Sequence, residues 1–175
     1  MTHYPQPVVT LALLAAAFGA VACKVGRQRA ETAPDTAFAA TQARGQTVMG
    51  VNQYTSAHAF EDLPDGGRIV LDRDDPRDSV AINTIRAHMR TIEAAFRAGD
   101  FSQPFGVHAQ VVPGTAVMTA RRGAISYTAI DRPRGAEVRL QSADSTAVAA
   151  IHAFLAFQRE AHHAPGHQGM PGSGH

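Results

Sequence analysis

The chain has 175 residues, of which 45% are hydrophobic and 18% charged, a composition typical of one globular domain. Sixteen Lys and Arg against fifteen Asp and Glu leave a net charge of +1, and no basic run is interleaved with aromatic residues, so no nucleic-acid partner is expected. The unusual number is nine histidines beside a single cysteine.

An apolar run over residues 8–22 has the length of a secretory signal rather than of a membrane span. It ends in Ala-Val-Ala before Cys23, which fits ordinary signal cleavage and also resembles a bacterial lipobox. We expect a signal peptide over residues 1–22 and lipidation of Cys23, because no second cysteine exists for a disulfide. The protein would then lie on the periplasmic side of the cell envelope, anchored to the membrane by that lipid.

Two other locations remain open for the chain. The first positive charges after the start, Lys24, Arg27 and Arg29, follow the apolar run instead of preceding it. This order disfavours export and leaves an uncleaved signal anchor as an alternative. The second alternative is a soluble protein in the periplasm or outside the cell, which would result from ordinary cleavage of the signal peptide without lipidation.

Composition divides the rest of the chain into three parts. Residues 24–48 are rich in Ala, Thr, Gln and Arg without a sustained apolar period, which predicts a flexible tether. The folded domain is expected over residues 49–163. The remaining residues, 164–175, are rich in Gly and Pro and predict a disordered tail.

The clearest helix signal lies in residues 77–99. Asp78 or Ser79 can cap its start, and Gly99 stands where a left-handed C-terminal residue belongs. Apolar residues recur at steps of three and four, as on a helix with one buried face; they are Ile82, Ile85, Met89, Ile92 and Phe96.

Strand-like segments flank two turns. Residues 57–63 and 68–72 surround Pro-Asp-Gly-Gly, and residues 124–131 and 136–141 surround Arg-Pro-Arg-Gly. The second pair leads into a helix capped by Asp144 or Ser145 and ending near Ala161.

Each half of the domain thus runs strand, turn, strand, acidic cap, helix, which indicates an internal ββα-ββα duplication. We predict an α+β fold in which two hairpins form a four-stranded antiparallel sheet, with two main helices on one face. The connection over residues 99–123 is long, with a short helix expected at residues 115–122, and connections of this length often carry function.

The histidines and methionines suggest metal chemistry, since imidazole suits copper or zinc and thioethers suit copper. No metal motif at short spacing occurs, so a site must be assembled from separate elements. The candidate ligands are His88, His152, His108 and His58, with Met118 as a soft donor. A second, looser set of candidates lies towards the chain end, at His162, His163, His167 and His175.

Less specific explanations compete with this one. His88 and His152 lie at the edges of apolar helix stripes, where a histidine commonly bonds to backbone or carboxylate groups. Signatures of catalysis are missing: Ser126 lies in no Gly-x-Ser-x-Gly elbow, and Cys23 belongs to the leader. We therefore assign no catalytic residue and favour a protein that is not an enzyme.

Short motifs spread over residues 49–163 carry a family resemblance. They include Asp65-Gly66-Gly67, Ile85-Arg86-Ala87-His88, Gly99-Asp100-Phe101, Pro113-Gly114 with Met118, and Ile151-His152-Ala153-Phe154-Leu155. Together they resemble an uncharacterised bacterial family of short exported proteins often labelled aspartate carbamoyltransferase. That label implies a transferase.

The sequence therefore leads to three expectations of function. The first is an envelope-anchored protein that binds a copper or zinc ion for sequestration or delivery. The second is a lipoprotein module, without enzymatic activity, whose helices or sheet bind a protein partner. The third is the transferase that the family label implies.

Overall fold

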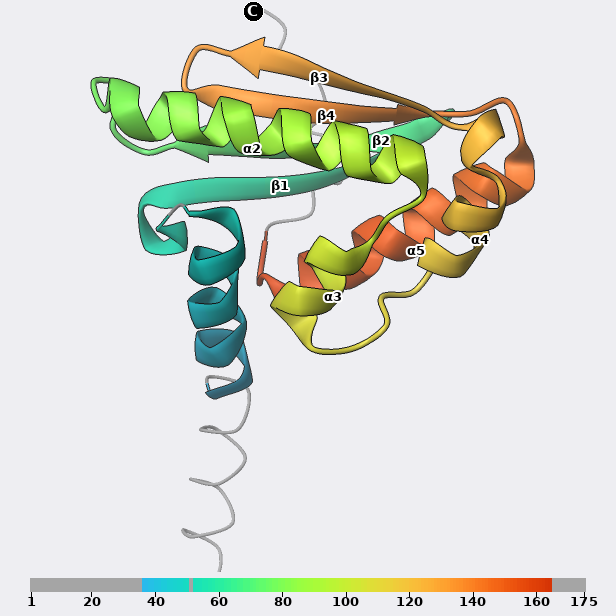
Figure 1. Cartoon of the computed structure of the whole chain (residues 1–175), viewed down its shortest axis with the longest axis horizontal. Coiled ribbons are helices and arrows are strands. Elements are labelled where there is room, and N and C mark those ends of the chain that lie inside the picture. Colours follow the sequence, from blue (N-terminus) through green and yellow to red (C-terminus); the bar gives the residue numbers. More distant parts are fainter. Residues whose placement is uncertain (1–35, 51, 165–175) are drawn as a thin grey trace, which may run out of the picture. The chain divides into compact units, whose positions relative to one another are not determined.

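The structure is a computed structural model that describes residues 36–50 and 52–164. The expected signal peptide, Cys23 and the residues after 164 lie outside the described residues. The described part is an α+β domain built on an antiparallel sheet with strand order β1-β2-β4-β3 (Figure 1). This is the predicted fold class.

The sheet consists of two hairpins joined side by side. The first is β1 (Ser56–Leu63) with β2 (Gly66–Arg73), and the second is β3 (Ser126–Arg132) with β4 (Gly135–Gln141). The inner strands β2 and β4 pair antiparallel and place Ile69 opposite Val138. Both hairpins were predicted, with ends that differ by at most two residues.

Helix α2 (Ser79–Ala98) follows the first hairpin and has the predicted caps. The Asp78 carboxylate accepts a hydrogen bond from the backbone N–H of Ala81 at 3.0 Å. Gly99 ends the helix in the left-handed conformation with φ 78°, which glycine adopts without steric cost. The five residues of the predicted stripe are the buried ones.

Helix α5 (Ser145–Ala161) follows the second hairpin and begins after the N-cap Asp144. Each long helix packs mainly on the hairpin of the other half, α2 on β3 and β4 and α5 on β1 and β2. Because the helix of each ββα unit packs on the hairpin of the other unit, the two units have an approximate two-fold arrangement. One face of the sheet and the two helices together enclose the core.

The opposite face of the sheet is polar and carries a chain of ion pairs. Arg68 pairs with Glu61 and approaches Glu137, and Arg132 joins Glu137 to Asp72. These residues alternate along the strands with the core residues, as the pleat of a half-buried sheet requires.

The connection between the halves is more structured than the sequence predicted. It contains α3 (Ser102–His108), α4 (Thr115–Ala120) and the 3₁₀ helix η2 (Arg122–Ala124). Only α4 was expected. A second 3₁₀ helix, η1 (Gln53–Thr55), precedes β1.

A flexible tether was expected over residues 24–48. The described part of this segment instead belongs to a helix that spans residues 36–49. Thr41, Gln42 and Gly45 are buried, so the helix packs through small and polar residues rather than through an apolar stripe. The Arg44 Nε donates to the Val107 carbonyl of α3 at 2.6 Å and ties the helix to the domain. Among the described residues, no helix is both long and apolar enough to cross a bilayer.

Gly114, the residue before α4, allows a test of how the connection between the two halves packs against α5. Its φ is 82°, and a Cβ at this position would stand 2.1 Å from the Ala150 carbonyl oxygen of α5. We expect Gly114→Ala to lower the free energy of unfolding by about 2–4 kcal/mol, because strain and a backbone clash add. Urea denaturation followed by circular dichroism measures the change.

Gly123→Ala is the matched control, since a Cβ there would meet no atom within 4 Å. It should change the free energy of unfolding by less than about 0.5 kcal/mol. Equal effects of the two substitutions would contradict the close approach of α4 to α5.

Candidate functional site

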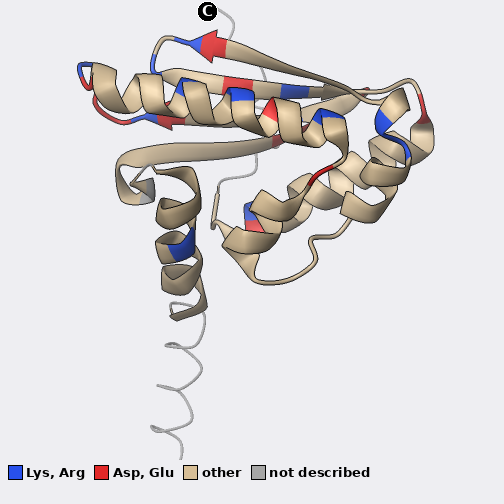
Figure 2. Cartoon of the chain, viewed as in Figure 1, with Lys and Arg blue, Asp and Glu red and all other residues tan. Residues whose placement is uncertain are grey.

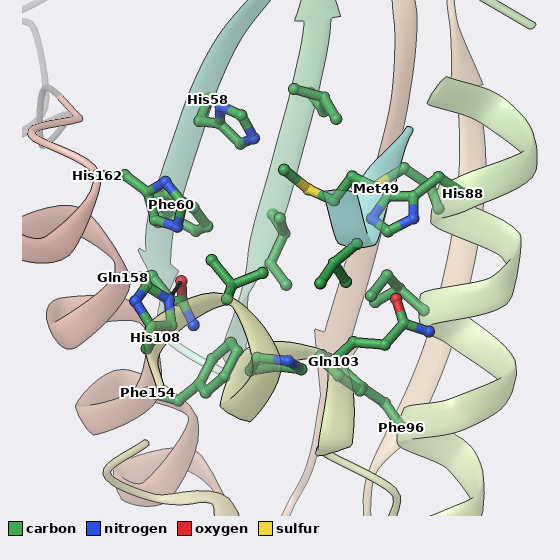
Figure 3. A pocket seen from close by; sticks show the side chains of 17 residues that line it. Met49, His58, Phe60, His88, Phe96, Gln103, His108, Phe154, Gln158 and His162 are labelled. Carbon is green, nitrogen blue, oxygen red and sulfur yellow. Dashed lines mark hydrogen bonds between the residues drawn. The ribbon is translucent and has the colours of Figure 1, made fainter. Parts of the chain in front are cut away.

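A cavity lies between the two long helices, over the part of the sheet formed by β1 and β2 (Figure 3). Its volume is about 70 Å³, room for roughly two water molecules at the volume that each occupies in the liquid. The described lining contains no Asp, Glu, Lys, Arg or Cys; it consists of Val48, Met49, His58, Phe60, Ile69, Leu71, His88, Met89, Ile92, Phe96, Gln103, Pro104, Val107, His108, Phe154, Gln158 and His162.

Two imidazoles face each other on the β1 side of the cavity. His58 comes from β1 and His162 is the C-cap of α5; their ring centres are 5.2 Å apart and the ring planes differ by 22°. Within the described part of the chain, the buried His58 Nε2 and His162 Nδ1 have no hydrogen-bond partner. Buried polar atoms in this condition are rare and call for an explanation, such as a bound ion or water.

Both rings are neutral at pH 7. Burial, together with a smaller effect of the nearby His88, lowers the pKa of His58 to about 4. Burial also lowers the pKa of His162 to about 3, helped by His58 and His108. A neutral imidazole keeps a lone pair on one nitrogen, and this is the form that binds metals.

His108, at the end of α3, is the third imidazole of this group. Its ring meets that of His162 edge to face, with ring centres 5.1 Å apart. His108 Nε2 lies 2.9 Å from Gln158 Oε1 and donates to it, which leaves the lone pair of the neutral ring on Nδ1. Burial lowers the pKa of His108, against the opposing effect of the Gln158 hydrogen bond.

His88 stands on the other wall of the cavity, on α2. Figure 3 shows it beside Met49, across from His58 and His162, with Gln103 of α3 below them. Burial lowers the pKa of His88 as well. The cavity thus has an imidazole wall of His58, His108 and His162, and a second wall with His88 and Met49.

Two predicted ligands lie elsewhere. His152 Nε2 donates to the Leu63 carbonyl at 3.0 Å, at the turn end of β1. This is the backbone contact expected of a helix-edge histidine. Met118 is fully buried in the hydrophobic core and does not line the cavity.

The histidines expected in a loose terminal site separate in the same way. His162 joins the cavity, whereas His163 is exposed and stacks on Phe38 with ring centres 4.4 Å apart. His167 and His175 lie outside the described residues.

The geometry of the imidazole wall can be compared with that of a metal site. Imidazoles that bind one ion at about 2 Å have ring centres about 5 Å apart, close to the separations of His162 from His58 and His108. No three His, Cys, Asp or Glu side chains within residues 36–50 and 52–164 already stand in a metal-binding group. Because the His58 and His162 rings are nearly parallel, their nitrogens converge only if one ring turns.

Sequence reasoning missed three parts of this site. His162 was placed among the terminal histidines, and Met49 and Gln158 were not selected. Gln158 is buried on the helix face that also carries Phe154 and Leu155. A glutamine inside an apolar stripe with a histidine four residues later was the available signal.

Comparisons of the chain with protein-family models, with curated proteins and with solved structures found no match in any of the three. The resemblance to the family labelled aspartate carbamoyltransferase therefore stays a prediction.

Proposed function

We propose that the chain binds a transition metal ion, copper before zinc, in the cavity between α2 and α5, and that it sequesters or delivers this ion at the cell envelope. The observation that carries the proposal is the pair of buried, unpartnered imidazole nitrogens, His58 Nε2 and His162 Nδ1. A buried polar group without a partner costs about 1–3 kcal/mol. One bound ion would supply the partner that both nitrogens lack.

His108 is the third ligand of the proposed site. Its Nδ1 keeps a lone pair because Nε2 donates to Gln158, so Gln158 orients the ring as outer partners of metal-bound histidines commonly do. A rotation of the His162 ring would direct its free nitrogen towards both neighbours. His88 lies on the opposite wall and lowers the pKa of His58.

The chemistry of the lining favours holding an ion over catalysis. The described lining offers imidazole, thioether and amide groups, with no carboxylate or thiol. Imidazole nitrogens bind copper and zinc well without a thiol, and a thiol would be open to oxidation outside the cytoplasm. Sequestration or delivery needs only binding and release.

The first test measures metal affinity after removal of the two nitrogens. His58→Phe and His162→Phe keep an aromatic ring of similar size in each place and remove both ring nitrogens. We expect each variant to bind Cu(II) and Zn(II) at least about 100-fold more weakly, since loss of even an outer-shell partner costs 10–100-fold. Competition titration with a chromophoric chelator gives the affinities.

The background for this test is the full chain with His3, His167 and His175 changed to Ala. These three histidines lie outside the described residues, and each could bind metal weakly. His152→Ala is the matched control on α5, and its affinity should stay within about threefold of the background. Unchanged affinity in both Phe variants would refute the site, and a background chain that binds neither zinc nor copper in either oxidation state would favour the interaction module.

Acid provides a second test. A ligand with the ordinary histidine pKa near 6.5 loses about tenfold in affinity between about pH 7 and pH 5.5, because protons then compete with the metal. The pKa values of His58 and His162 are lowered to about 4 and about 3, and burial lowers that of His108 as well, so protons compete less than they would with solvated histidines. We expect the Zn(II) affinity of the background chain to fall less than tenfold between about pH 7 and pH 5.5.

The same titration on the His152→Ala variant should give the same flat profile. A tenfold or larger loss of Zn(II) between about pH 7 and pH 5.5 would show that ordinary, solvated histidines hold the ion.

Attachment to the envelope is tested at Cys23, the only cysteine of the chain. We expect Cys23→Ser to abolish incorporation of labelled palmitate and to move the protein from the membrane fraction to the soluble fraction. A variant that stays in the membrane fraction would support the signal anchor instead.

A further inference from the structure

We propose that the ion is Cu(I) and that the thioether of Met49 completes its coordination. This inference rests on the metal-binding function proposed above and adds the oxidation state and the ligand that selects it.

The charge of the cavity favours a monovalent ion. The described lining offers imidazole, thioether and amide groups but no carboxylate or thiolate. An imidazole binds a metal in its neutral form, so a bound ion keeps its full charge. The energy needed to move an ion from water into a medium of low dielectric constant rises with the square of its charge, about fourfold from Cu(I) to a divalent ion.

A neighbouring cation strengthens this preference. Arg44 donates to the carbonyl of Val107, the residue before His108, so its positive charge lies near that imidazole. A divalent ion beside His108 would feel twice the repulsion that a monovalent ion feels. Many zinc sites include thiolates or carboxylates, which offset the charge of the divalent ion, and the described lining has neither.

The chemical types of the metal-binding atoms also favour Cu(I). Thioether sulfur is a soft ligand that selects Cu(I), and imidazole binds copper readily. Met49 lines the cavity, and Figure 3 shows its side chain beside His88 and directed inward. The thioether of Met89 lines the same wall of the cavity.

The helix that carries Met49 is fixed to the segments that carry two of the other ligands. Arg44 donates to the carbonyl of Val107, the neighbour of His108, and Phe38 stacks on His163, the neighbour of His162. Coordination of one Cu(I) by Met49 and the imidazoles would therefore clamp residues 37–49 onto α3 and the end of α5.

The experiment compares Met49→Leu with the same alanine background. Leucine keeps the apolar volume and removes the sulfur. Cu(I) is kept reduced with ascorbate without oxygen and is competed with bathocuproine disulfonate. We expect the background to bind Cu(I) more tightly than Zn(II), and Met49→Leu to lose at least tenfold in Cu(I) affinity while its Zn(II) affinity stays the same.

Met118→Leu is the control, because Met118 is a buried methionine that lies outside the cavity. It should leave both affinities unchanged. In hydrogen exchange, Cu(I) should slow the amides of residues 37–49 in the background chain and not in Met49→Leu.

The outcomes separate the two proposals. Equal Cu(I) affinity of the background and Met49→Leu, with metal binding still lost in His58→Phe, overturns the role of Met49 and leaves the metal site. Tighter binding of Zn(II) than of Cu(I) overturns the assignment of oxidation state. A background chain that binds none of these ions overturns both proposals.

Discussion

The structure depends on the antiparallel pairing of β2 with β4. This contact joins two hairpins that are far apart in the sequence and makes one sheet with a single apolar face. Both long helices must then bury their stripes on that face, and each lies over the hairpin of the other half. The cavity occupies the space that α2 and α5 leave between them, closed by α3 and by the helix of residues 36–49.

The fold was largely predictable because its signals are local. The stripe from Ile82 to Phe96, the cap Asp78 and the left-handed Gly99 lie within one segment and needed no knowledge of the partner surface. The helix of residues 36–49 was predicted as part of a flexible tether, for the opposite reason. Its buried residues are Thr41, Gln42 and Gly45. Small and polar residues leave no apolar pattern in the sequence, so only contacts in the structure, such as that of Arg44 with Val107, reveal that this helix packs on the domain.

The candidate site was predictable only in part. The expectation that separate elements would each supply one histidine was made from spacing, and the structure brings His58, His88 and His108 to one cavity. It could not distinguish His152 from His162, because both lie on α5 and only the approach of β1 decides which one meets His58. The distribution of charge differs between the elements: α3, which lines the cavity, carries no Asp, Glu, Lys or Arg, whereas such residues are spread along α2 and the strands (Figure 2).

The position of His162 affects how quickly an ion could leave. This residue caps the last turn of α5, and its backbone N–H bonds to carbonyls of that turn only. Final helical turns open locally at a free energy far below that of global unfolding. Fraying of one turn would withdraw a single ligand while the sheet, α2 and α3 remain intact. An acceptor could therefore take over the ion by stepwise ligand exchange starting at this end, without unfolding of the domain.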